Sequence, residues 1–352
     1  MREETGNPFA ERLEKLRKLA RRRRLDLVLV QGEANVRSLT GVACDNACFT
    51  MDRLYTDFRY VPMVHRTAPW LPVGDIRRLS VREKARGGVR PRRIGYEGDI
   101  PHSRFAALAR DFRGAAFVDI GRDLLALRAV KTPDECERLR AAAALNDEIW
   151  LEAQGKFRAG MTEREMARVI RHLMVERGDG EAFETIVCAG RNAAECHHVP
   201  DDTVWDGREP VLVDMGVKLA GYCSDMTRNI VPARCSLAYR KAYDLVLEAN
   251  RAAIAAAKPG MTGKALDRVA RRIIAEGGFG KCFGHSLGHG VGLEIHEAPN
   301  ASARSDWTLE PGMAVTIEPG VYLEGNLGVR IEDLVLITEN GCEVLTHSPK
   351  GR

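Results

Sequence analysis

Long apolar runs are absent from this sequence. Of its 352 residues 45% are hydrophobic and 29% charged, yet no segment approaches the 18 or so consecutive apolar residues of a membrane-spanning helix. The opening MREETGNPFAERLEKL also lacks the apolar stretch and the small-residue cleavage site of a secretory signal. We therefore expect no membrane helix, no membrane partner and a cytoplasmic location.

A regular cysteine pattern is absent as well. The nine cysteines are an odd number and are scattered through the chain. A disulfide framework is typical of short secreted chains with an even number of cysteines at regular spacings. The sequence therefore predicts reduced thiols, in agreement with a cytoplasmic location.

The chain has little excess charge of either sign. The net charge is +4, and much of the positive excess lies in a basic run at Arg17, Lys18 and Arg21 to Arg24. Such a run could be a nucleic-acid-binding arm. Because it continues the helical spacing of Leu13, Leu16 and Leu19, we favour the solvated face of an amphipathic helix and expect no nucleic-acid partner.

The length of the chain and its local patterns predict two domains. Residues 25–30 and 94–97 are strand-like and lie between helical stretches, which predicts a small α/β domain over residues 1–127. A new helix is expected after Lys131, with Thr132 as its N-cap, Pro133 as its first residue and Glu135 completing a capping box. We expect the second domain to cover residues 128–352.

This second domain contains a weak internal repeat. The tripeptide Gly-Met-Thr occurs at Gly160 to Thr162 and again at Gly260 to Thr262, each time between two helical segments and ahead of strand-like segments. The pattern predicts a pseudo-symmetric α+β domain with a site between its halves.

Four carboxylates interrupt apolar, strand-like segments of that domain. Asp214 and Asp225 are expected on two strands of a hairpin, and Glu318 and Glu332 repeat the arrangement fourteen residues apart. Burying an ionised carboxylate without a partner costs several kcal/mol, so four together must either bind protons or be compensated by cations. Two divalent cations would balance their charge.

A histidine in a glycine-rich segment is the expected fifth ligand. His289 lies among Gly288, Gly290 and Gly292, which allow the backbone to approach a site closely. A lone imidazole beside carboxylates suits first-row transition metals better than Mg²⁺ or Ca²⁺. We expect Mn²⁺, with Co²⁺ or Zn²⁺ as alternatives, because ligand type does not separate these ions.

Several motifs taken together resemble one enzyme family. They are Ile186 to Asn192 followed by His197, then Asp214, Ser-Asp225-Met-Thr-Arg, Gly-His289-Gly with His296-Glu-Ala-Pro, Ile317-Glu318-Pro-Gly-Val-Tyr322 and Val329-Arg330-Ile-Glu332-Asp. Over residues 128 to 345 this set resembles the Xaa-Pro aminopeptidases and Xaa-Pro dipeptidases (prolidases), which are dinuclear metallopeptidases of the pita-bread fold. The leading domain is similar to their creatinase-type N-terminal domain. The resemblance implies an α+β enzyme that cleaves peptides with proline at the second position.

The resemblance also implies a role for each ligand. Asp225 and Glu332 would bridge two metal ions, Asp214 would chelate one of them, and His289 and Glu318 would complete the other. A hydroxide held between the ions would attack the scissile carbonyl, with Glu318 as proton shuttle.

Further residues of the motifs would act beside the metals. His197 and His296 correspond to pocket histidines that stabilise the oxyanion and hold the residue before the proline. Arg330 lies two residues before Glu332, on the same face of the expected strand, and would orient a ligand carboxylate. Tyr322 would line the pocket.

One departure from the family pattern bears on specificity. Many prolidases carry an arginine where this chain has Asn300, and that arginine grips the C-terminal carboxylate of a dipeptide. Asparagine cannot form this bidentate charged contact. The substitution favours an aminopeptidase that accepts longer Xaa-Pro peptides, with a strict dipeptidase as the alternative.

Other functions fit the sequence less well. A methionine aminopeptidase uses the same ligand types, but its last two ligands are farther apart and it normally lacks the leading domain. A non-enzymatic binding module of this fold would have lost ligands that are all present here. The resemblance further implies a homodimer, which is an expectation by analogy alone.

Overall fold

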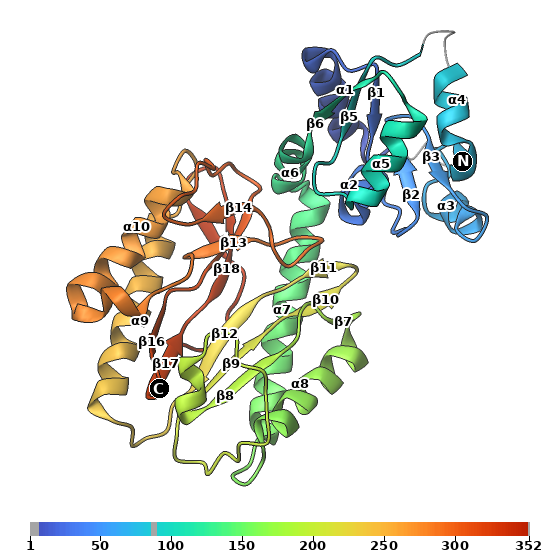
Figure 1. Cartoon of the computed structure of the whole chain (residues 1–352). Coiled ribbons are helices and arrows are strands. Elements are labelled where there is room, and N and C mark those ends of the chain that lie inside the picture. The colour runs from blue at the N-terminus through green and yellow to red at the C-terminus, as the bar shows by residue number, and fades with distance from the viewer. Residues whose placement is uncertain (1–6, 86–89, 351–352) are drawn as a thin grey trace, which may run out of the picture. The chain divides into compact units, whose positions relative to one another are not determined.

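The computed structural model describes residues 7–85 and 90–350, which divide into two compact units, Met1–Arg128 and Ala129–Arg352 (Figure 1). The first six residues, part of the segment inspected for a secretory signal, lie outside the described ranges. Within those ranges no helix is both long and apolar enough to cross a bilayer. The cysteines at all nine positions have free thiols in the structure.

The first unit is an α/β domain with two small sheets. Its elements are α1 (Ala10–Arg23), β1 (Leu27–Leu29), α2 (Glu33–Thr40), β2 (Ala47–Phe49), β3 (Leu54–Thr56), α3 (Val61–Thr67), β4 (Val73–Asp75), α4 (Leu79–Ala85), β5 (Arg93–Tyr96), α5 (His102–Asp111), β6 (Ala116–Asp119) and α6 (Gly121–Ala129). One sheet has the parallel order β1-β5-β6, and the other has the order β2-β3-β4 with β2 and β3 antiparallel.

Helix α1 confirms the amphipathic interpretation of the basic run. Leu13, Leu16 and Leu19 are buried in the core of the first unit. The arginines of the last turn are exposed, and Arg23 forms an ion pair with Asp123. The basic run is therefore the solvated face of a packed helix.

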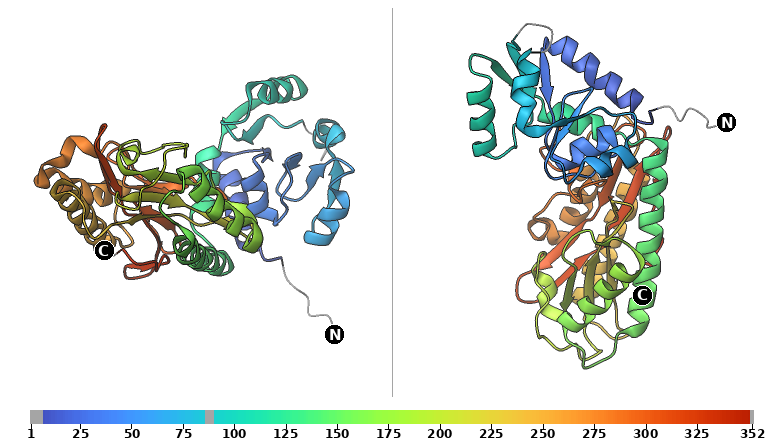
Figure 2. Two further views of the ribbon diagram at one scale, coloured as in Figure 1. Left: turned by 90° about the horizontal axis from the view of Figure 1, so that it is seen from below. Right: turned by 90° about the vertical axis from the view of Figure 1, so that its right-hand side faces the viewer.

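The second unit contains four long helices and mostly antiparallel sheets. Its elements are α7 (Pro133–Lys156), α8 (Glu163–Arg177), β7 (Gly180–Glu181), β8 (Ile186–Ala189), the 3-10 helix Gly190–Ala194, β9 (Val211–Met215), β10 (Val217–Leu219), β11 (Tyr222–Cys223), β12 (Met226–Ile230), α9 (Leu237–Ala256), α10 (Gly263–Ile274), β13 (Gly288–Gly290), β14 (Glu297–Ala301), β15 (Ala314–Ile317), β16 (Gly320–Leu323), β17 (Leu327–Arg330), β18 (Asp333–Ile337) and β19 (Cys342–Val344). Strands lie between the pair α7 and α8 and the pair α9 and α10 (Figures 1 and 2). The predicted capping box of Thr132 and Glu135 begins α7.

The internal repeat predicted from the sequence is present in the structure of the second unit. Thr162 caps α8 and Thr262 caps α10, each accepting a backbone hydrogen bond from the third residue of its helix. Gly160 and Gly260 have φ values of 95° and 82°, in the left-handed region that glycine tolerates best. In both copies the backbone after the glycine pairs with a distant loop, through the bridges Thr162↔Val204 and Thr262↔Thr308. The prediction of two similar halves is confirmed.

The strand assignments of the four carboxylates need correction. Only Asp214 lies within a strand, β9, whereas Asp225 immediately precedes β12 and both glutamates lie in the short connections after β15 and before β18. Strands β9 and β12 do pair antiparallel, but β10 and β11 between them belong to another sheet, so the two aspartates are not joined by a simple hairpin. Apolar neighbours alone did not distinguish a strand interior from a strand end.

Candidate metal centre

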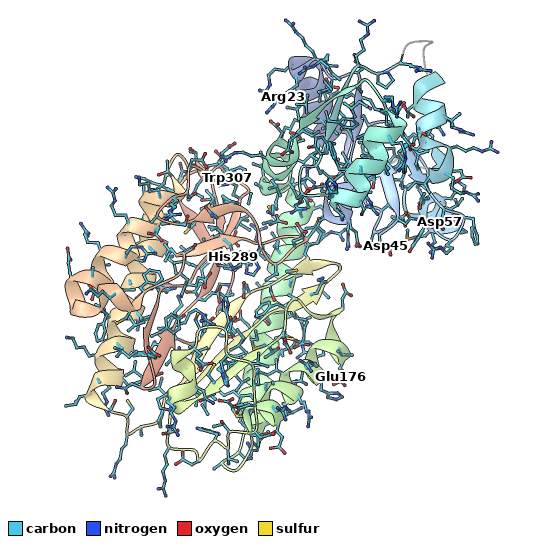
Figure 3. The ribbon with its side chains drawn as sticks, viewed as in Figure 1. Arg23, Asp45, Asp57, Glu176, His289 and Trp307 are labelled. Carbon is cyan, nitrogen blue, oxygen red and sulfur yellow. The ribbon has the colours of Figure 1, made fainter. Side chains whose placement is uncertain are left out.

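Three of the predicted ligands meet in one cluster. Asp225, His289 and Glu332 each offer an atom, and these atoms all lie within 4.8 Å of one another. The Nε2 atom of His289 lies 3.5 Å from an oxygen of Asp225 and 3.5 Å from an oxygen of Glu318. His289 Nδ1 faces its neighbour's carbonyl, Gly290 O, at 3.1 Å, so Nε2 is the nitrogen presented to the carboxylates. Figure 3 labels His289 within the second unit.

The remaining predicted ligand, Asp214, adjoins the cluster through Arg330. Arg330 donates from Nη2 to Asp214 Oδ2 at 2.8 Å and from Nε to Thr227 Oγ1 at 2.9 Å. Thr227 Oγ1 in turn donates to Glu332 Oε2 at 2.7 Å. The prediction that Arg330 and Glu332 lie on one strand was wrong, because β17 ends at Arg330, although both side chains contact Thr227 Oγ1. The carboxylate that the arginine contacts directly is that of Asp214, another predicted ligand.

Two carboxylate oxygens in this region are buried without a hydrogen-bond partner. They are Asp214 Oδ1 and Glu332 Oε1. Leaving a buried acceptor unsatisfied costs about 1–3 kcal/mol, and more for a charged group. Oxygens left open in this way, beside an imidazole nitrogen that also faces inward, fit divalent transition-metal ions, whose donors in proteins are carboxylate oxygens and neutral imidazole nitrogens.

The protonation of the cluster agrees with that fit. Burial, together with the nearby charges of the other carboxylates, raises the pKa of Asp225 and of Glu318 well above the ordinary range. Burial and the charge of Asp214 raise the pKa of Glu332 to about 8. Burial and the neighbouring His296 lower the pKa of His289 to about 4, which keeps its imidazole neutral and able to act as a ligand. Without cations the surroundings therefore favour the protonated forms of Asp225, Glu318 and Glu332.

A second cluster of potential ligands behaves differently. Glu163, His198 and Asp201 also place donor atoms within 4.8 Å of one another. None of these three side chains has a buried polar atom that lacks a partner. A hydrogen-bond network therefore satisfies this cluster without an ion, whereas in the first cluster Glu332 Oε1 is left without a partner.

The metal cluster opens into a cavity of about 430 Å³. Its wall carries all five predicted ligands together with the predicted pocket residues His197, His296 and Arg330. The rings of His289 and His296 meet edge to face, with centroids 4.3 Å apart. Asn300 also lines the cavity and pairs in register with His289 across strands β13 and β14. Residues drawn from both halves of the repeat thus form one cavity.

Sequence reasoning did not single out His285, which also lines this cavity. Its Nε2 atom lies 2.9 Å from the hydroxyl of Tyr322, and that hydroxyl also accepts a hydrogen bond from Arg330 Nη1 at 2.8 Å. Tyr322 is not among the residues that line the cavity, contrary to the prediction, but it contacts His285 and Arg330, which do line it. Burial and the charge of Arg330 lower the pKa of His285 to about 4, so its ring is neutral. The four-residue spacing from His289 in a glycine-rich segment was the signal that could have identified it.

Fold and site together define the class of protein: a two-domain α+β enzyme with a carboxylate-rich candidate metal centre between structural repeats. The family model for metallopeptidase family M24 matches residues 137–339, and that for the creatinase/prolidase N-terminal domain matches residues 12–130. The chain belongs to metallopeptidase family M24, which confirms the predicted fold and the assignment as a metallopeptidase.

Named relatives cover nearly the whole chain. It is 33% identical to the Xaa-Pro dipeptidase of Pyrococcus horikoshii, over 97% of this chain and 98% of the relative. Its structure is similar to an Xaa-Pro dipeptidase from Bacillus anthracis, with a TM-score of 0.91, 34% identity and coverage of 97% and 99% of the two chains. It is also similar to an X-Pro aminopeptidase from Thermotoga maritima, with a TM-score of 0.86, 33% identity and coverage of 96% and 98%.

Proposed function

We propose that this protein is a metal-dependent Xaa-Pro dipeptidase. The observation that carries the proposal is the cluster of Asp225, His289 and Glu332, which opens into a cavity lined by further histidines. Relatives named Xaa-Pro dipeptidase match almost the full length of the chain. This reverses the preference for an aminopeptidase that Asn300 suggested, because the named relatives favour the dipeptidase.

The metal ligands proposed are Asp214, Asp225, His289, Glu318 and Glu332, with Mn²⁺ as the expected ion and Co²⁺ or Zn²⁺ as alternatives. Support comes from the two unpartnered buried oxygens and the neutral imidazole of His289. When bound, divalent ions supply Lewis acidity that polarises the scissile carbonyl and activates water at neutral pH.

The protein's own residues would position and protonate the substrate around that centre. Glu318 lines the cavity with its side chain 16% exposed and an oxygen 3.5 Å from His289 Nε2, and it is proposed to accept and return the proton of the attacking water. His197 and His296 line the cavity and are proposed to stabilise the oxyanion and hold the residue before the proline. Arg330 orients Asp214 by a direct hydrogen bond, and Tyr322 orients Arg330 and His285 through its hydroxyl.

An Xaa-Pro aminopeptidase is the second candidate, and the charges of the cavity favour it. Among the cavity-lining residues in the described part of the chain, Arg330 is the single arginine or lysine. Its guanidinium is engaged with Asp214 and Thr227, and Asn300 brings no charge. The cavity therefore offers no free guanidinium to a dipeptide's C-terminal carboxylate.

Hydrolysis of Ala-Pro and Ala-Pro-Ala by Mn²⁺-loaded protein separates the two candidates. We expect a kcat/KM at least about tenfold higher for the dipeptide, a difference of about 1.4 kcal/mol, because the relatives that match almost the full length of the chain are named Xaa-Pro dipeptidases. Ala-Ala serves as the control for proline specificity and should remain intact. Faster cleavage of the tripeptide would establish the aminopeptidase, and cleavage of neither proline peptide would remove both candidates.

Domain boundaries, assembly and location are also proposals. We place the boundary between residues 127 and 128, with support from the units that divide at Arg128 and from the matched ranges 12–130 and 137–339. A homodimer is proposed from the family resemblance, and sedimentation velocity tests it. A cytoplasmic location is proposed from the nine free thiols.

A further inference from the structure

A fully buried glutamate lies at the start of α8, outside the metal cluster. The side chain of Glu163 is 0% exposed, and its carboxylate holds together three segments. Oε1 accepts from Ala189 N at 2.6 Å and Asn192 Nδ2 at 3.0 Å, whereas Oε2 accepts from Asp201 N at 3.2 Å. The last partner of Oε2 is His198 Nε2, at 2.7 Å. The carboxylate thus joins the end of β8, the following 3-10 helix and the loop after it.

That loop carries His197 into the cavity. A turn is closed by the hydrogen bond from His198 N to Glu195 O, and His197 lies within it. His197 is exposed and forms no hydrogen bond with the part of the chain that the structure describes, so its neighbours must set its position. Before it, Cys196 O accepts from Arg330 Nη1 at 3.2 Å. After it, the side chain of His198 is 10% exposed and bound to Glu163.

Helix capping does not account for Glu163. Thr162 caps α8 and Glu165 completes the capping box, so the helix start is satisfied without it. The equivalent position of the second repeat is Gly263, where a Cβ atom would lie 2.2 Å from Asn300 O. The repeated fold therefore forms with no side chain at this position.

The interaction between Glu163 and His198 is charge-assisted. Burial by itself lowers the pKa of His198, but the hydrogen bond and the charge of Glu163 raise it, and the net shift is upward. A hydrogen bond in which the donor or the acceptor is ionised is roughly twice as strong as a neutral one. The hydrogen bond to Glu163 therefore fixes the position of His198, the residue next to His197.

We propose that the buried pair Glu163 and His198 is a latch that positions His197 in the substrate cavity. His198 is a positioning residue, since its side chain faces Glu163 and acts on the substrate only through His197. The inference rests on the proposed function for its kinetic consequence, whereas the anchoring itself is a property of the loop.

A double-mutant cycle tests whether His198 acts through His197. His198→Ala should lower kcat for Ala-Pro about tenfold with little change in KM or bound Mn²⁺, and the same change in a His197→Ala background should lower it less than about twofold. His198→Gln can still donate to Glu163 and should recover most of the rate. His172→Ala is the matched control, because His172 forms a 3.9 Å pair with Glu176 on the same helix with both side chains exposed.

An equal fall in kcat on His198→Ala substitution in the wild-type and His197→Ala backgrounds would overturn the proposal, because His198 would then act independently of His197. Loss of bound metal specific to His198→Ala would also overturn it and make Glu163, His198 and Asp201 a metal site.

Hydrogen exchange tests, independently of catalytic activity, whether the pair Glu163 and His198 anchors the loop. Amides of the loop 195–203 should exchange faster in His198→Ala than in the wild type, His198→Gln or His172→Ala. Unchanged exchange in that loop would refute the anchoring. If the wild-type protein cleaves no Xaa-Pro peptide, the proposed function fails, while the exchange rates still decide whether Glu163 and His198 hold the loop.

Discussion

At the residue scale, the site divides into groups that bind and groups that orient. Asp225 and Glu332 are nearly fully buried, at 4% and 1% exposure, and this burial and the charges of neighbouring carboxylates raise the pKa of each. His197 is exposed and lies on the cavity wall, outside the cluster of Asp225, His289 and Glu332. Substitution of a proposed metal ligand should therefore have a different effect on metal binding from substitution of His197.

Asp225→Asn and His197→Ala are expected to separate these groups. Asparagine keeps the shape of Asp225 but removes the charge that compensates a cation, so metal and activity should be lost together, by at least about tenfold in metal affinity. His197→Ala should retain the metal and slow turnover by about 10²-fold, as removal of one oxyanion donor does. Metal analysis and initial rates measure both effects.

Asp111→Asn, at an exposed position of the first unit, is the control for this comparison. Loss of metal from His197→Ala would show that the division into ligands and pocket residues is wrong.

At the element scale, the repeat gives each half the same means of beginning a helix. Both N-cap threonines accept a backbone hydrogen bond, but only α8 has the reciprocal bond of a capping box, from Thr162 N to Glu165 Oε2 at 2.8 Å. The same glycine conformation precedes both caps. Local sequence therefore determines where these helices start.

Thr162→Ala should lower the free energy of unfolding by about 1 kcal/mol, because the first turn of α8 loses an acceptor for a backbone N–H. Thr262→Ala should lower it by a similar or smaller amount, since α10 has no capping box. Urea denaturation measures both. Thr67→Ala is the control at an exposed threonine that lacks a side-chain hydrogen bond, and a loss there equal to that of Thr162→Ala would contradict the capping argument.

At the scale of the whole molecule, the carboxylate cluster ties stability to metal and to pH. The folded pKa of Glu332 is about 8, above its ordinary 4.5, and the pKa values of Asp225 and Glu318 are raised in the same direction. Between the ordinary pKa of 4.5 and the folded pKa of about 8, Glu332 holds a proton in the folded metal-free protein that it has already released in the unfolded chain. Its stability is therefore greatest below the ordinary pKa and falls as pH rises towards 8.

Metal-free protein should lose about 2 kcal/mol of unfolding free energy between pH 6 and pH 8 because of Glu332 alone. Protein saturated with Mn²⁺ should be more stable at pH 8 and should show a smaller loss, since ions that bind only the folded state stabilise it. Denaturation with and without a chelator at the two pH values measures the difference. A metal-free protein that is more stable at pH 8 than at pH 6 would contradict the raised pKa values.

The sequence by itself determined the helix starts, the amphipathic α1 and the order of two domains, and it was sufficient to predict the candidate metal donors. Each depends on residue chemistry or on contacts within a few positions, such as the bond between Thr132 and Glu135. The tertiary structure decided that Arg330 pairs with Asp214, 116 positions away, and that Glu163 holds His198 across 35 positions. It also brought His285 to the cavity wall and placed three of the carboxylates at strand ends. Contacts of such long range depend on how strands and loops pack, and no local spacing records that packing.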